Sequence, residues 1–457
     1  MFDASGARRS AQSLCVVTAV MFAACSPDRA GAPIAGGAIA VDSADTEEAL
    51  AGQLLPAPIT VRVLTASGAP AAHVRVHLVA QDGGTITPSF ATTDSAGGVS
   101  VHWTLGPGAG LHEAMASAGP LSPIAVTVQV DPSNAMPLDS LQPLRLGTYE
   151  GTGQVVHPDF ARVGREGALR GGLLAITPYP NGNPAYENPA FYRSEDFVGW
   201  AVPVGTPDPV VRPNDGYLSD PDLVYDPVRG ELLLYYREVG HTNTILMTHS
   251  PDGVAWSHAD TVTVAPNQEL VSPSIVRRSA TEWLMWAVNA HTGCSDERAE
   301  LELRRSENGT TWSDPEPVQL SQQGVMPWHV DVQWIPSRQE YWALFPAKRP
   351  ASCSTTALYL ATSPDGVTWR TYPSPVLARG ASAEFADIVY RSTFIYHPRS
   401  DVITFWYSGA RYENGRYVWS AMVQRLKREA LFARLAKPAR TSLMLPRPGI
   451  PELRDPP

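Results

Sequence analysis

The stretch "SPDGVTW" at Ser363–Trp369 belongs to a repeat from which the fold can be inferred. Three other stretches share its outline: "SEDFVGW" from Ser194, "SPDGVAW" from Ser250 and "SENGTTW" from Ser306. Their serines lie 56, 56 and 57 residues apart, and each stretch ends in a Trp. Repeats of roughly 50 residues that each contain several short strands are typical of β-propeller blades. We therefore predict an all-β fold with about one blade per repeat.

Each repeated stretch resembles the Asp-box, a Ser-x-Asp-Gly turn closed by an aromatic residue that recurs in sialidases and other sugar-cleaving propellers. The Asp and Gly suit a tight turn, and the Trp suits the space between blades, so we expect a structural role. Apolar strand patterns beginning near the axis recur as "PDFARV", "DLVYD", "SIVRRS", "HVDVQW" and "ADIVYR". We therefore predict a five-bladed propeller over residues 145–430.

The N-terminal residues predict export. Arg8 and Arg9 precede an apolar run that ends at Ala24 and is too short for a stable membrane anchor, which is typical of a signal peptide over residues 1–24. The sequence "FAAC" at residues 22–25 resembles the bacterial lipobox. It predicts a lipid on Cys25 and anchoring in the bacterial cell envelope.

Four segments outside the propeller follow from composition and patterning. Residues 25–54 are rich in small residues and predict a flexible tether, and residues 132–144 predict a linker. Residues 55–131 alternate apolar and polar positions, which predicts a small β-sandwich. The stretch "ATTDSAGGVSVHWTLGPGAG" resembles bacterial immunoglobulin-like domains of the invasin type, which act mostly as spacers. Residues 431–457 predict a solvated C-terminal tail.

Charge limits the classes of partner. The formal net charge is −10 and the sequence pI is about 5.6. Nucleic acid and anionic membrane surfaces attract basic proteins, so neither is expected as a main partner. The lipid on Cys25 would then supply the only membrane contact.

The starts of the predicted inner strands contain acidic residues at equivalent positions. They are Asp159, Asp222, Asp331 and Asp387, with Ser274 in the third blade. Carboxylates crowded around one axis acquire unequal pKa values, which acid–base hydrolysis of sugars requires. Other residues predicted at the same end of the axis are His157, Tyr179, Tyr186, Glu187, Asp220, Arg237, His291, Trp328, His329, Arg349, Glu384 and Arg411.

The blade count, the inner-strand acids and "HPDF…ITPYPNGNPAYENPAFYRS" resemble the five-bladed glycoside hydrolases of families 43 and 32. The resemblance implies a surface-anchored enzyme that hydrolyses the glycosidic bonds of oligosaccharides or polysaccharides. It implies that Asp159 is the general base. At the family's other two acidic positions this sequence has Ser274 and Asp331. The role of general acid is therefore open among Glu187, Asp222, Asp331 and His329.

Two alternatives stay open. A noncatalytic carbohydrate-binding or adhesin-like lipoprotein fits the unmatched acid, and a sialidase-like enzyme would use Arg237, Arg349 and Arg411 to bind a carboxylate. No cofactor or metal is predicted. Axial carboxylates suit Ca²⁺, but no contiguous Asp-rich loop is present, and the histidines are far apart in sequence.

Cys294 and Cys353 are predicted to form a disulfide. Both lie in loops after the second strand of adjacent blades, on one face of the propeller. Export to an oxidising compartment favours their pairing.

Overall fold

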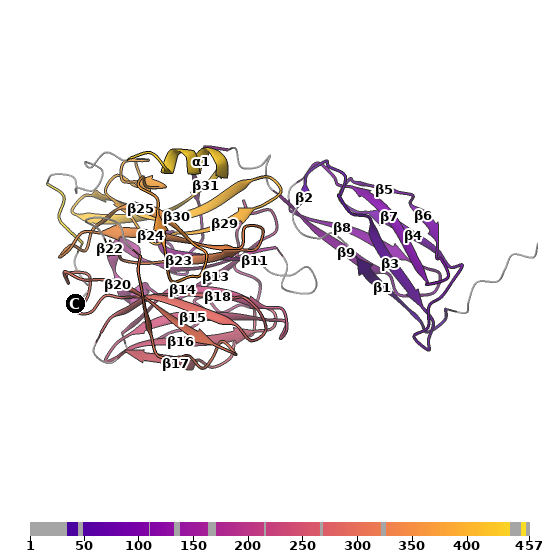
Figure 1. Ribbon diagram of the computed structural model, residues 1–457, viewed down its shortest axis with the longest axis horizontal. Helices are drawn as coiled ribbons and strands as arrows, with labels where there is room; N and C mark the ends of the chain where they lie inside the picture. The colour runs from indigo at the N-terminus through magenta and orange to yellow at the C-terminus, as the bar shows by residue number, and fades with distance from the viewer. Residues whose placement is uncertain are drawn as a thin grey trace, which may run out of the picture. The chain divides into compact units, whose positions relative to one another are not determined.

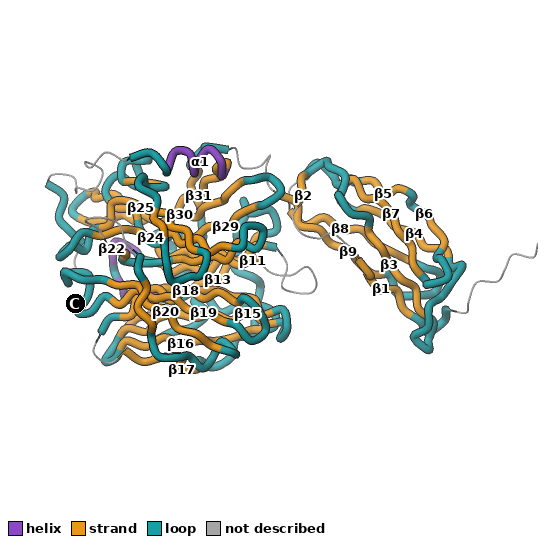
Figure 2. Tube along the Cα trace, in the orientation of Figure 1, coloured by secondary structure: helices purple, strands orange, loops and turns teal. Residues whose placement is uncertain are grey.

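A computed structural model describes residues 34–43, 49–108, 110–131, 138–162, 171–213, 216–265, 268–320, 326–438 and 449–453. The predicted signal peptide and Cys25 lie outside these residues. The chain forms two compact units. Unit 1 takes its residues from the first 126, and unit 2 contains the chain from 127 onward together with residues 46–51 and 107–112. Strands dominate both units (Figures 1 and 2).

The N-terminal strands form two sheets, with orders β1-β3-β7-β5 and β2-β9-β8-β4-β6. Burial alternates along β3 and β8, so the predicted period-two pattern is confirmed there. Two of these strands lie in the predicted tether, because the alternating sequence "AIAV" pairs with β3 instead of staying free. The strands are β1 (Ala38–Ser43), β2 (Ala49–Leu50), β3 (Ile59–Leu64), β4 (Arg75–Ala80), β5 (Thr85–Thr87), β6 (Phe90–Thr92), β7 (Gly98–Thr104), β8 (Gly110–Ser117) and β9 (Ile124–Asp131).

The first three sheets of unit 2 are antiparallel and follow chain order. Sheet 1 contains β11 (Val155–Arg162), β12 (Gly172–Pro178) and β13 (Ala190–Ser194). Sheet 2 contains β14 (Tyr217–Asp226), β15 (Glu231–Val239), β16 (Asn243–Ser250) and β17 (Asp260–Ala265). Sheet 3 contains β18 (Leu270–Arg277), β19 (Trp283–Asn289), β20 (Glu300–Ser306) and β21 (Glu316–Val318).

The last two sheets have interrupted inner strands. Sheet 4 contains β22 (Met326–Pro327), β23 (Asp331–Ile335), β24 (Glu340–Lys348), β25 (Thr355–Ser363), β26 (Arg370–Thr371) and β27 (Leu377–Ala378). Sheet 5 contains β28 (Ile388–Val389), β29 (Thr393–His397), β30 (Val402–Glu413) and β31 (Arg416–Lys427), and β10 (Gln142–Leu144) adds to β31. The predicted linker therefore ends in a strand of the last sheet.

The inner strands of these sheets close a ring. β11 contacts β14, β14 contacts β18, β18 contacts β23, β23 contacts β29, and β29 contacts β11 again. Separate antiparallel sheets repeated around an axis leave only short, protected edges, which is the propeller arrangement. The prediction for the last inner strand was incomplete, because "ADIVYR" at residues 386–391 contains β28, the first part of the interrupted strand, whereas β29 is the part that joins the ring.

In all four repeated turns the Ser Oγ donates a hydrogen bond to the Asp or Asn two residues on. In the last turn, Ser363 Oγ donates to Asp365 Oδ1 at 2.9 Å and accepts from Gly366 N at 2.8 Å. Trp369 Nε1 then donates to Gly366 O at 3.1 Å. Gly366 has φ +76°, and a Cβ there would lie 2.7 Å from the Trp286 ring of the neighbouring sheet. These contacts close the turn and support the predicted structural role.

A disulfide joins two loops that follow second strands, and a helix follows the last strand. The Cys294–Cys353 disulfide is present as predicted, with Cα atoms 4.8 Å apart. Helix α1 (Arg428–Leu435) buries Leu431 and Leu435, so this part of the predicted solvated tail is packed instead. Short 3-10 turns η1 (Pro180–Gly182) and η2 (Pro184–Tyr186) follow β12. Among the described residues, no helix is long and apolar enough to cross a membrane.

Candidate active site

β-Bulges in three inner strands direct a residue near the start of each strand towards the axis. In β11, His157 and Pro158 oppose a single residue of β12, and the register shifts at the same place in β14 and β18. The bulged residues His157, Asp220 and Ser272 have φ of 56°, 52° and 53°. Positive φ is unfavourable for residues other than Gly and is often found where function requires it. Each is followed by Pro, which lacks the N–H that a regular ladder needs.

The bulges create two layers of side chains on the axis, two residues apart in sequence. We call the first the mouth layer, and it consists of His157, Asp220, Ser272, His329 and Arg391. We call the second the latch layer, and it consists of Asp159, Asp222, Ser274, Asp331 and Thr393. In sheets 4 and 5 a break in the inner strand replaces the bulge, between β22 and β23 and between β28 and β29.

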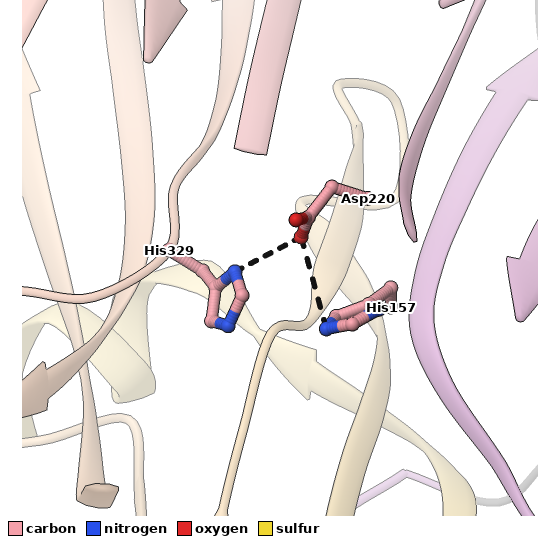
Figure 3. Close-up of side chains that lie close together, drawn as sticks. All are labelled: His157, Asp220 and His329. Carbon is pink, nitrogen blue, oxygen red and sulfur yellow. Dashed lines mark ion pairs between the residues drawn. The ribbon is translucent and has the colours of Figure 1, made fainter. Parts of the chain in front are cut away.

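Three mouth-layer side chains converge (Figure 3). His329 Nδ1 lies 3.0 Å from Asp220 Oδ1, and His157 Nε2 lies 3.7 Å from the same oxygen. The three side chains are almost fully buried, and each offers a ligand atom within 4.8 Å of the others. The histidines were expected to be separate because they are far apart in sequence. That expectation was wrong for this pair, since the ring of sheets brings them together with ring centroids 5.0 Å apart.

Hydrogen bonds determine which nitrogen of each imidazole carries the proton. Ser272 Oγ donates to Asp220 Oδ1, so its oxygen accepts from His329 Nδ1–H at 2.7 Å. Thr177 Oγ1 donates to Val156 O, so it accepts from His157 Nδ1–H at 3.1 Å. Within the described part of the chain, Nε2 of neither histidine has a hydrogen-bond partner. Both Nε2 lone pairs are therefore available to a ligand.

Burial and charge give these groups distinct protonation states. Burial holds the pKa of His157 well below its usual value and also lowers the pKa of His329. Burial would raise the pKa of Asp220, but the two histidines and Arg391 outweigh it and hold this pKa well below its usual range. Burial thus favours the neutral form of both imidazoles, while the hydrogen bond from His329 and the Arg391 guanidinium favour the ionised form of Asp220 even when the imidazoles are neutral.

A small cavity opens onto this cluster. Its volume is about 60 Å³, and Glu187, Arg237, Tyr179 and Trp328 line it together with the three converging side chains. Burial raises the pKa of Glu187 well above its usual value, and Asp220 adds to the effect. Arg237 Nη2 pairs with Glu269 Oε2 at 3.1 Å. The cavity therefore combines a protonated acid, an ionised acid and a guanidinium.

The latch layer binds adjacent sheets to one another. Asp159 Oδ2 accepts from Leu223 N at 2.7 Å, and Asp222 Oδ2 accepts from Ile275 N at 3.1 Å. Ser274 Oγ accepts from Val332 N at 2.8 Å in the same way. Each bond joins one inner strand to the next, so these side chains stabilise the ring.

The three latch-layer acids lie outside the walls of the site cavity. Asp159 and Asp222 line a separate cavity of about 510 Å³ instead. Burial raises the pKa of Asp159 to about 6 and that of Asp331 to about 8, and it raises the pKa of Asp222 well above its usual value. Their carboxylates approach closely enough to hold a cation.

Sequence reasoning missed the positive charge that separates the two layers. The Arg391 guanidinium is fully buried, with Nη1 3.8 Å from Asp220 Oδ1 and Nη2 3.8 Å from Asp159 Oδ1. Nη2 also lies 3.9 Å from Asp222 Oδ1. In "HPD", "DPD" and "HVD" a mouth-layer residue comes two positions before a latch-layer residue. Arg391 stands in the same relation to Thr393, so this pattern would have identified Arg391 once β29 was placed correctly.

Several predicted site residues lie elsewhere. Asp387 accepts from Tyr412 N at 2.7 Å and sits beside β28, outside the ring of inner strands. Tyr186 is 40% exposed and His291 lies 3.9 Å from Glu300, and neither lines the cavity. Three more predicted residues are outside the cavity: Glu384 and Arg411, which line another pocket, and Arg349, which pairs with Glu452. The arginines therefore do not converge as the sialidase-like alternative requires.

Comparisons with known proteins give one relative and a fold. No protein-family model matches the chain. "A type blood N-acetyl-alpha-D-galactosamine deacetylase" from Flavonifractor plautii is 27% identical over 307 residues, which are 56% of this chain and 40% of that protein. The chain thus matches less than half the length of this relative.

Solved structures share the propeller. An N-acetylgalactosamine deacetylase from F. plautii, in complex with blood group B trisaccharide, has a TM-score of 0.59 at 23% identity and covers 65% of this chain and 97% of that chain. A thermostable family-43 glycoside hydrolase has a TM-score of 0.43 at 12% identity and covers 60% of this chain and 88% of that chain. The similarity to the deacetylase structure shows a shared fold.

Proposed function

We propose that the protein is a carbohydrate-acting hydrolase that removes the acetyl group from an N-acetylated amino sugar. The observation that carries this proposal is the cluster of His157, Asp220 and His329, in which each side chain offers a ligand atom within 4.8 Å of the others and both Nε2 atoms have no hydrogen-bond partner among the described residues. The relative named as an N-acetylgalactosamine deacetylase supports the choice of bond.

The cluster has the chemistry of a divalent-cation site. Metal ligands must be neutral imidazoles and ionised carboxylates, which are the states that burial and pairing favour here. Ser272 and Thr177 orient the two rings through Nδ1, as outer hydrogen-bond partners of ligating histidines commonly do. A cation held by two His and one Asp with open positions would supply Lewis acidity and an activated water.

The remaining side chains supply acid–base chemistry and binding. Glu187, with its raised pKa, is suited to carry the proton that the departing nitrogen needs. Arg237 is a fixed positive charge for the polarised carbonyl oxygen. Tyr179, Trp328 and Trp419 line the cavity, and their rings suit stacking against a sugar face.

The overall step is hydrolysis of an amide. Water oxygen bonds to the acetyl carbon and the carbon–nitrogen bond breaks. Both protons from water end on the nitrogen, so acetate and a protonated amino sugar leave. Neither an oxidant nor a second substrate is needed.

The test measures two products from one substrate. The purified protein is stripped with EDTA, supplied with Zn²⁺ or Mn²⁺, and incubated with an aryl glycoside of N-acetylgalactosamine. We expect metal-dependent acetate release, which His329→Gln and Asp220→Asn abolish. His291→Gln is the matched control, because this histidine lies outside the cavity, and it should retain activity. Equal acetate release by His329→Gln and wild type would refute the proposal.

Glycosidic hydrolysis is a second candidate, and one observation favours it. Glu187 has a raised pKa and Asp220 a lowered one, which is the inequality that a glycosidase acid and base require. In the same assay this candidate predicts release of the aryl group without acetate and without dependence on metal. Sugar binding with neither product would instead favour the carbohydrate-binding alternative.

We also propose the architecture and location from the sequence. The five sheets would be five blades, the strands of residues 55–131 an immunoglobulin-like spacer, and Cys25 a lipidated residue that follows a signal peptide. The disulfide supports an oxidising compartment. Incorporation of radiolabelled palmitate into the wild-type chain but not into Cys25→Ser would support this location, and equal labelling would contradict it.

A further inference from the structure

A short C-terminal segment, residues 450–453, lies across the face that contains the site cavity. One side of the segment contacts sheet 5. Tyr417 Oη donates a hydrogen bond to Pro451 O, and Ile450 packs against the cluster that contains Tyr417 and Trp419. Both aromatic residues belong to β31. The segment is therefore fixed first to the last sheet of the ring.

The other side of the segment contacts the loop between β24 and β25 in sheet 4. Glu452 Oε1 accepts from Ser352 Oγ at 3.1 Å and lies 3.4 Å from Arg349 Nη2. Leu453 N donates to Ser354 Oγ at 3.3 Å. This loop also contains Cys353, so the disulfide holds the second attachment point in place. Two neighbouring sheets thus anchor the two ends of the segment.

Between these attachments, Leu453 forms part of the cavity wall. It lines the cavity together with Trp328, Trp419 and the disulfide, and it packs against the apolar clusters of both sheets. The resulting volume of about 60 Å³ is well below the roughly 300–1,000 Å³ typical of pockets for small molecules. The site as enclosed by Leu453 admits a small group more readily than an extended chain.

Apolar packing, rather than the ion pair, holds the segment in place. Pro451 and Glu452 are exposed, and the Arg349–Glu452 pair lies at the surface, where ion pairs contribute little. Ile450 and Leu453 pack against apolar clusters instead, so the position of Leu453 in the cavity wall depends on its side chain.

We propose that residues 450–453 determine which substrates reach the site, restricting it to the terminal unit of an oligosaccharide. This inference rests on the proposed function, because it names the substrate class of the same cavity. Units inside a chain continue on two sides, and Leu453 blocks one of them. The segment is a specificity determinant and takes no part in bond breaking.

The experiment compares three chains: the full chain, a chain ending at Pro438, and a chain ending at Leu453 as the matched control that retains the segment. Each is assayed for kcat/KM on two oligosaccharides that carry an N-acetylated amino sugar at the terminus or at an internal position. For the chain ending at Pro438 we expect the internal-to-terminal ratio to rise about tenfold or more, within the range that pocket contacts control. The control should keep the ratio of the full chain.

A point variant keeps the test independent of folding. Leu453→Gly retains the segment but removes the side chain, and it should raise the same ratio by a smaller factor. An unchanged ratio in both the shortened chain and Leu453→Gly would overturn the inference.

Calorimetric titration with the internal oligosaccharide separates this inference from the proposed reaction. If no chain releases acetate but the shortened chain binds more tightly than the full chain, the wall is supported and the deacetylation is refuted. If acetate is released and the full and shortened chains have equal affinities and equal internal-to-terminal ratios, the role of residues 450–453 is refuted and the deacetylation is not.

Discussion

Replacement of Arg391 by Met should destabilise unit 2 in a pH-dependent way. The guanidinium is fully buried and lies 3.8–3.9 Å from carboxylate oxygens of Asp159, Asp220 and Asp222. Removing one partner of a buried ion pair typically costs about 3–5 kcal/mol, because the remaining charge stays buried. Since these contacts are longer than hydrogen bonds, we expect the lower end, about 3 kcal/mol, and a fall in Tm of about 6–12 °C.

The sign of the pH dependence follows from the carboxylates. Arg391 lowers the pKa of Asp159, which is about 6 in the folded protein, so the attraction is present above that pH and is lost as the pH falls through it. Asp220 stays ionised across the range because its pKa is well below its usual value. The loss caused by Arg391→Met should therefore be largest at pH 8 and smaller, but not zero, at pH 5.

The assay is thermal unfolding followed by circular dichroism at both pH values. Arg411→Met is the matched control, because its pair with Glu413 is at the surface and contributes at most about 1 kcal/mol. If the two variants lose equal stability, or if the loss for Arg391→Met does not change with pH, the electrostatic role assigned to Arg391 is wrong.

Three further outcomes follow. Glu187→Gln should lower kcat about 10²–10⁴-fold with little change in KM in steady-state acetate release, whereas an unchanged kcat would remove its acid–base role. Burial raises the pKa of Asp331 to about 8, so wild-type stability falls as the pH rises from about 4, the ordinary pKa of Asp, to about 8, and the loss is complete above that pH. Asp331→Asn should therefore gain at least about 1 kcal/mol over wild type at pH 8 but not at pH 4 in urea unfolding. Replacing Cys294 and Cys353 by Ser should cost about 4 kcal/mol in the same measurement, as expected for a sequence separation of 59, and no loss would show that the bridge is dispensable.

The repeats predicted the propeller because their period is a property of the sequence itself. The spacing of the boxes located β11, β14, β18 and β23 to within a few residues. It was incomplete in the last sheet, where "ADIVYR" contains β28 but β29 is the part that joins the ring. Periodicity alone does not distinguish two adjacent apolar runs, and the contact with β11 decides between them.

The sequence predicted which end of the axis contains the site, but not which side chains converge there. His157, Asp220 and His329 were among the candidates, yet the general-base role was given to Asp159, and only His329 of the three was considered for the acid, beside Glu187, Asp222 and Asp331. A bulge reverses which residue of a strand faces a cavity, and its location depends on pairing with the next strand, which the sequence does not state. The convergence of His157 and His329 depends on closure of the ring, so their separation of 172 positions in sequence gave no indication of it.

The spacing between the mouth and latch layers has an evolutionary consequence. Because adjacent sheets are joined by latch-layer side chains and backbone amides, the bulged positions His157 and Ser272 carry none of these inter-strand bonds. Mutational drift at such positions would change the reaction while the scaffold persists. The same ring of sheets could thus pass from one hydrolytic chemistry to another by exchanging a few bulged residues, provided that the buried Arg391 keeps its carboxylate partners.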